Sequence, residues 1–158
     1  PGYVKEQLQD YLEPKRGICY MDRTLCPDPF HDGEDYLNEV FFGAQCYDLI
    51  DRSMQAILEY DDEYSAHDWR SLVQMCDHKY LMRKRYQYMV QHGYAAMDDT
   101  LHEELETLEK ESLIAQNMYI KYTVTDDLET IRRLRERLQA MKQKDICATK
   151  TLISLVEA

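Results

Sequence analysis

Apolar residues recur along most of the chain at steps of three and four positions, which is the spacing of one face of an α-helix. This pattern predicts four long helices, over 35–60, 65–92, 101–122 and 126–157, and a short helix over 4–12. Glycine and proline are scarce, with five and four residues, so little interrupts the helices. The predicted fold class is therefore all-α.

Polar turns separate the long helices into pairs, which predicts two antiparallel helical hairpins, over 34–93 and 94–158. Gly93 is expected to follow the end of the second long helix in a left-handed conformation. Three of the four prolines lie after the short helix, within residues 1–33. We expect that segment to be an irregular N-terminal arm, because each proline fixes its own φ and restricts the residue before it.

Apolar residues predict the faces that the second and fourth long helices bury. The second long helix is expected to bury Trp69, Leu72, Val73, Cys76 and Tyr80. The fourth has a heptad seam that a single charged residue, Asp145, interrupts. The seam runs through Ile131, Leu134, Leu138, Met141, Asp145, Ala148, Leu152 and Leu155. Thr125 or Asp126 is the expected N-cap of this helix.

Charge argues against nucleic-acid binding, which needs a basic face. The chain has 30 acidic and 19 basic residues and a net charge of −11. Its one basic run, 83–85, is interpreted as the solvated face of a helix. No run of about 18 apolar residues occurs, so no direct membrane span is expected. The first residues resemble neither a secretory signal nor a transit peptide.

The common helical and phosphate-binding enzyme sites are also disfavoured. A di-metal carboxylate site in a four-helix bundle needs a histidine three residues after a glutamate on two helices, and none of the five histidines is so placed. There is no glycine-rich phosphate loop and no Gly-x-Ser-x-Gly motif. Cys76 and His78 would point to different sides of one helix. We therefore expect no catalytic residue, no cofactor and no metal.

Five cysteines remain to be explained. Cys46 and Cys76 lie at equal distances from the turn at position 61, so facing antiparallel helices would bring them together, either as a disulfide or as two buried thiols. Cys19 and Cys26, with His31, do not have the usual spacing of zinc ligands. Those two cysteines are candidates for a second disulfide. Cys147 has no assigned role.

The cysteine pattern resembles the twin Cys-x9-Cys hairpin of the CHCH proteins of the mitochondrial intermembrane space. Cys46 and Cys76 match the outer pair of that family, and Ala56 and Ala66 stand in place of the inner pair. Residues 76–83, Cys-Asp-His-Lys-Tyr-Leu-Met-Arg, look like the second cysteine helix of a CHCH accessory subunit of respiratory complex I, of the beta subcomplex subunit seven type. The resemblance implies a disulfide between Cys46 and Cys76 that staples the first hairpin.

The same resemblance implies a function. It points to a non-catalytic accessory subunit of mitochondrial NADH:ubiquinone oxidoreductase. Such a subunit lies peripherally on the intermembrane-space side of the inner membrane and binds other subunits of that large complex. Thirteen tyrosines and eight methionines suit broad contact faces. The alternative is a free-standing four-helix interaction or coat protein with reduced thiols.

Overall fold

The computed structural model describes residues 2–13, 43–60 and 70–156. These ranges hold five α-helices: α1 (Gly2–Leu12), α2 (Cys46–Tyr60), α3 (Arg70–Gln91), α4 (Asp99–Thr125) and α5 (Leu128–Leu155). A 3₁₀ turn, η2 (Gly43–Gln45), leads into α2. The helix predicted over 35–60 therefore begins later, at Cys46, and its predicted residues 35–42 lie outside the described ranges. The described residues contain no strand beyond one isolated bridge between Ala95 and Val156. The all-α prediction is confirmed.

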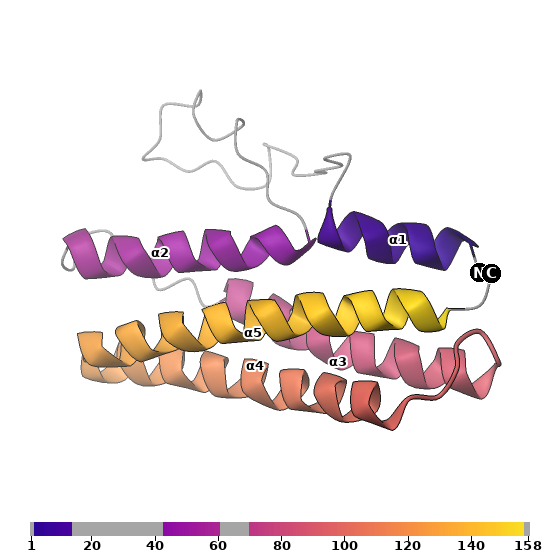
Figure 1. Ribbon diagram of the computed structural model, residues 1–158. Helices are drawn as coiled ribbons and strands as arrows, with labels where there is room; N and C mark the ends of the chain where they lie inside the picture. Colours follow the sequence, from indigo (N-terminus) through magenta and orange to yellow (C-terminus); the bar gives the residue numbers. More distant parts are fainter. Residues whose placement is uncertain (1, 14–42, 61–69, 157–158) are drawn as a thin grey trace, which may run out of the picture.

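The helices form a bundle in which α1 and α2 lie end to end and together complete a fourth rod (Figure 1). α4 packs against both α3 and α5, while α1 and α2 both pack on α5. The bridge between Ala95 and Val156 joins the segment before α4 to the end of α5, so these two helices run antiparallel. α5 is therefore the helix on which the two short N-terminal helices assemble.

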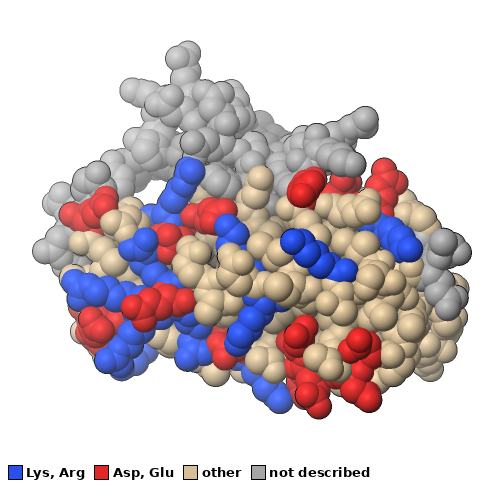
Figure 2. Space-filling view, in the orientation of Figure 1, with Lys and Arg blue, Asp and Glu red and all other residues tan. Residues whose placement is uncertain are grey.

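The main partner of α2 is α5 and not α3, which differs from the hairpin predicted over 34–93. Two ion pairs hold α2 to α5. Lys142 Nζ lies 2.6 Å from Asp48 Oδ1, and Arg135 Nε lies 2.8 Å from Asp51 Oδ1. Basic side chains gather over the first half of α5, next to acidic ones (Figure 2). The apolar period predicted the helices, but it did not predict the partner of α2, which these ion pairs hold together with the buried Tyr47, Ile50 and Met54.

The turn between α4 and α5 is built by two aspartates. Asp126 is left-handed, with φ of 51°, and its N–H bonds to the carbonyl of Tyr122. Asp127 is the N-cap of α5, and its carboxylate accepts a hydrogen bond from the Glu129 N–H at 3.1 Å. The predicted cap, Thr125 or Asp126, was wrong by one or two residues. Asp126 instead ends α4, since aspartate tolerates the left-handed conformation.

The buried face of α5 matches the expected seam from Ile131 to Leu152, but the face of α3 does not match its predicted one. Tyr80 is 46% exposed, whereas Lys79 is 3% exposed. The prediction that Tyr80 is buried was therefore wrong. Of the other predicted positions, Leu72 is buried, Val73 and Cys76 are partly buried, and Trp69 lies outside the described residues. The buried positions of α3 are Leu72, Met75, Lys79, Met82, Tyr86 and Met89. A lysine occupies the core-facing position because it has a buried carboxylate partner, Asp145.

Gly43 allows η2 to touch the end of α1. Its φ is +54°, and a Cβ built on it would lie 2.0 Å from the carbonyl oxygen of Tyr11. Gly93 also has a positive φ, +71°, as expected for the residue after α3, but a Cβ there would meet nothing within 4 Å. Both glycines therefore adopt a left-handed conformation, but only Gly43 lies so close to a neighbouring backbone that a Cβ would not fit.

We predict that Gly43→Ala destabilises the protein more than Gly93→Ala. Both variants carry the cost of a left-handed alanine, but only the first forces η2 away from α1. The additional loss in the free energy of unfolding should be about 1–3 kcal/mol, measured by urea denaturation. Equal losses for the two variants would show that the contact between η2 and α1 contributes nothing.

Candidate functional site

A buried polar cluster lies where α1, α2, α3 and α5 meet. It comprises Lys79 of α3, Asp145 of α5, Tyr11 of α1 and Tyr47 of α2, and we call it the polar anchor. Lys79 Nζ donates to Asp145 Oδ2 at 2.5 Å and to the Tyr11 hydroxyl at 2.8 Å. The Tyr11 hydroxyl in turn donates to Asp145. One lysine and one carboxylate thus connect three helices by hydrogen bonds.

Aromatic rings surround the ammonium group of Lys79. Its Nζ lies 5.2 Å from the ring centroid of Tyr11 and 5.3 Å from that of Tyr47, within the range of cation–π attraction. His78 stacks on Tyr11 with ring centroids 5.1 Å apart. The Tyr47 ring brings α2 into the cluster, so the anchor touches both N-terminal helices.

Burial sets the protonation behaviour of the anchor. Desolvation lowers the pKa of Lys79, and the neighbouring Asp145 carboxylate opposes this effect. Burial and the same carboxylate raise the pKa of both Tyr11 and Tyr47, so the phenols stay protonated. Burial, with the positive charges of Lys79 and Arg85, lowers the pKa of His78 to about 4. We interpret the anchor as a structural charge pair, because its charged atoms bond to each other.

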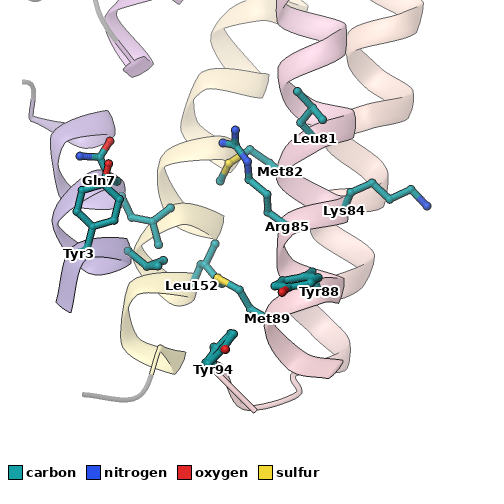
Figure 3. A pocket seen from close by; sticks show the side chains of 12 residues that line it. Tyr3, Gln7, Leu81, Met82, Lys84, Arg85, Tyr88, Met89, Tyr94 and Leu152 are labelled. Carbon is teal, nitrogen blue, oxygen red and sulfur yellow. The ribbon is translucent and has the colours of Figure 1, made fainter. Parts of the chain in front are cut away.

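A groove runs between α1 and α3, with α5 beneath it (Figure 3). Its volume is about 620 Å³, within the usual range of binding sites. We call it the α1/α3 groove. It is lined by Tyr3, Val4, Gln7, Leu8, Leu81, Met82, Lys84, Arg85, Tyr88, Met89, Tyr94 and Leu152.

The groove has an apolar floor and an aromatic rim. Met82, Met89, Leu8 and Leu152 are buried and form the floor, where methionines adapt to varied apolar shapes. The rim exposes large side chains, namely Tyr3, Leu81, Tyr88 and Tyr94. Lys84 and Arg85 are its charged residues, and both are basic in a chain whose net charge is −11.

The polar anchor positions one wall of the groove. Tyr11 lies near the end of α1, one turn beyond Gln7, and its hydroxyl is held by Lys79 and Asp145. The rest of α1 contributes one residue to the core, Leu8. The anchor therefore holds the end of α1 beside the groove, and Leu8 and Val4 pack the rest of this helix on the core.

The predicted cysteine pair is not joined in the structure. No disulfide involves Cys46, Cys76 or Cys147 within the described ranges. The Cys76 thiol faces α4, with Sγ 3.4 Å from Gln116 Oε1, while Cys46 begins α2. Burial raises the pKa of both Cys46 and Cys76, which weakens them as nucleophiles. The predicted candidates Cys19, Cys26 and His31 lie outside the described residues.

Among residues 2–13, 43–60 and 70–156, no three side chains of the types His, Cys, Asp and Glu lie close enough to hold a metal ion. No helix in these ranges has the length and apolar character needed to cross a membrane.

Comparison of the chain with protein-family models, with curated proteins and with solved structures found no match.

Sequence reasoning did not identify the polar anchor or the groove. One signal was available, because Asp145 interrupts an otherwise apolar seam and a charge at such a position needs a buried partner. That partner is Lys79, which directly precedes Tyr80, the residue that was expected to be buried. The groove had no comparable signal, since it depends on where α1 lies against α5.

We predict that Lys79→Met or Asp145→Leu alone costs about 3–5 kcal/mol of unfolding free energy, because each leaves a buried charge without its partner. The double variant should recover most of this loss. Denaturant titration of all four proteins gives the coupling free energy of the pair. The exposed pair of Lys110 and Glu106 is the control, and Lys110→Met should cost under about 1 kcal/mol. Anchor variants that cost no more than this control would contradict the assignment.

We predict a pH dependence of stability from His78. Its pKa is lowered from 6.5 to about 4 on folding, so its contribution is present above pH 6.5 and is lost as the pH falls toward 4. The total loss should be about 3 kcal/mol. His78→Gln should reduce the loss measured between these pH values. His92→Gln, at an exposed position, should retain the wild-type loss; identical curves for both variants would refute the prediction.

Proposed function

We propose that the protein is a non-catalytic interaction protein that binds an amphipathic helix of a partner chain in the α1/α3 groove. The observation that carries the proposal is the exposure of large apolar side chains around a buried apolar floor. Single exposed apolar residues are common on protein surfaces, but a contiguous group marks a contact site. A groove between two helices offers a matched surface for the apolar face of a third.

The charges of the groove specify the partner further. Lys84 and Arg85 lie along α3 at the groove, and Lys84 points away from its interior (Figure 3). Basic side chains beside an apolar floor favour a helix that carries acidic residues next to its apolar face. The proposed ligand is therefore an acidic amphipathic helix, whose apolar residues contact Met82 and Met89.

The titratable groups support a non-catalytic role. The thiols of Cys46 and Cys76 have raised pKa values, whereas a nucleophilic cysteine needs a lowered one. The His78 ring is neutral at pH 7, since its pKa is about 4, and it stacks on Tyr11. A general base works best with a pKa near the operating pH.

We predict that Leu81→Lys weakens partner binding by about tenfold, which corresponds to about 1.4 kcal/mol at an apolar contact. Tyr80→Lys is the matched control. Tyr80 and Leu81 are adjacent on α3 and are 46% and 45% exposed, but only Leu81 lines the groove.

The measurement is quantitative mass spectrometry of chains cross-linked to the tagged protein in its native cells. We expect a partner chain that cross-links to the wild-type protein to be lost with Leu81→Lys and to be retained with Tyr80→Lys. Equal recovery with both variants would reject the groove as the binding site.

A second candidate is the accessory subunit of mitochondrial complex I, peripheral on the intermembrane-space side, with Cys46 and Cys76 joined. One structural observation favours it. Lys79 lies three residues after Cys76, and its Nζ lies 5.3 Å from the ring centroid of Tyr47, the neighbour of Cys46. The start of α2 thus lies near Lys79, although the Cys76 thiol itself faces α4 and is not joined to Cys46 in the structure. The sequence of 76–83 adds the resemblance to a CHCH helix.

The two candidates predict different states of the thiols. For the complex I subunit, we expect a Cys46–Cys76 disulfide in protein from its native source and copurification with NADH:ubiquinone oxidoreductase activity. For the free-standing protein, both thiols react with an alkylating agent without prior reduction. Mass spectrometry of the alkylated, unreduced protein distinguishes them, and alkylation of both cysteines would eliminate the complex I candidate.

A further inference from the structure

α4 exposes an apolar stripe on the side that is not used in the core. Leu113, Ile120 and Val124 are 54%, 44% and 79% exposed, and Asn117 between them is also exposed. The four residues follow steps of four, three and four, which is the spacing of a coiled-coil seam. We call them the α4 stripe.

The stripe is separate from the packing of α4 within the bundle. The buried residues of this helix belong to its other face, where it meets α3 and α5; they are Leu101, Leu105, Leu108, Ser112, Ala115, Tyr119 and Tyr122. α4 therefore has two apolar faces, and only one is covered by the described elements. A helix of 27 residues with a second seam is suited to pairing with another helix.

We propose that the α4 stripe pairs with the α4 stripe of a second copy of this chain, in an antiparallel two-fold dimer. In this register, Leu113 of each copy packs against Val124 of the other, and Asn117 packs against Ile120. The arrangement is isologous, so each contact occurs twice. It rests on different residues from the groove proposed above for partner binding.

Charge complementarity selects the antiparallel orientation. Lys110 lies one turn before Leu113, and its Nζ is 3.4 Å from Oε1 of Glu106, in a pair whose two side chains are both exposed. In the proposed register, Lys110 faces the Asp126–Asp127 turn of the other copy, so a positive side chain meets two exposed carboxylates. A parallel pair would instead place Lys110 against Lys110 and each acidic turn against its counterpart.

The polar residue of the stripe lies near the two-fold axis. The axis passes midway between Asn117 and Ile120, so the two Asn117 residues are separated by about 4.5 Å along the helix direction, at 1.5 Å per residue. Their amide side chains can then bond to each other. A buried asparagine in an apolar seam fixes register, which suits a pairing that uses few apolar residues.

Sedimentation equilibrium of the whole chain tests the dimer. The seam is short, so we expect a dissociation constant of about 1–100 μM. Ile120→Lys should weaken association about tenfold or more. Leu49→Lys, at an exposed apolar position on α2, should leave it unchanged. A wild-type protein that stays monomeric at about 500 μM would overturn the proposal, as would equal effects of the two substitutions.

Cysteine cross-linking tests the orientation. Leu113→Cys protein mixed with Val124→Cys protein should form a disulfide between the two introduced residues, identified by mass spectrometry of the linked peptides. Leu113→Cys alone should not link to itself through that residue. Self-linkage at Leu113→Cys would refute the antiparallel register. Leu81→Lys should still dimerise, so failure of the groove proposal and failure of the dimer proposal are distinguishable.

Discussion

The buried ion pair between Lys79 and Asp145 is the contact on which the arrangement of the N-terminal helices depends. Burying two charges is costly, and their mutual attraction offsets that cost only when the geometry is good and the remaining polar atoms are bonded. Here the Tyr11 hydroxyl supplies the additional bonds and the Tyr47 ring lies beside the ammonium group. The cluster therefore specifies which helices meet at this point, a selectivity that interchangeable apolar contacts would not provide.

This constraint connects the core to the surface that we propose for binding. α1 is short and buries one residue, Leu8, so the bonds of Tyr11 and the close approach of Gly43 are a large part of what holds it in place. Its position in turn determines the width of the α1/α3 groove. The proposed function thus depends on a buried charge pair at one end of the site, while the binding surface itself is apolar and aromatic. The proposed dimer contact on α4 lies on another helix and does not share this dependence.

The sequence predicted the described helices, apart from the late start of α2 at Cys46, because the apolar period is a local property of each segment. It also identified the buried face of α5, including Asp145 as an unusual residue within a seam. It failed on α3, where Tyr80 was expected inside and Lys79 lies there instead. Lysine is rarely buried without a partner, so its placement follows only when Asp145 is known to face it. The partner of α2 was missed for the same reason, because pairing between distant helices is decided by specific side-chain contacts.

Hydrogen exchange of the backbone amides in Tyr11→Phe protein, compared with wild type, tests most directly whether the polar anchor holds α1 on the bundle. The substitution removes one hydroxyl and keeps the aromatic ring. If the anchor positions α1, exchange should become faster throughout Gly2–Leu12, while the amides in the middle of α4 keep their protection. Unchanged protection in α1, or an equal loss in α1 and α4, would contradict the account.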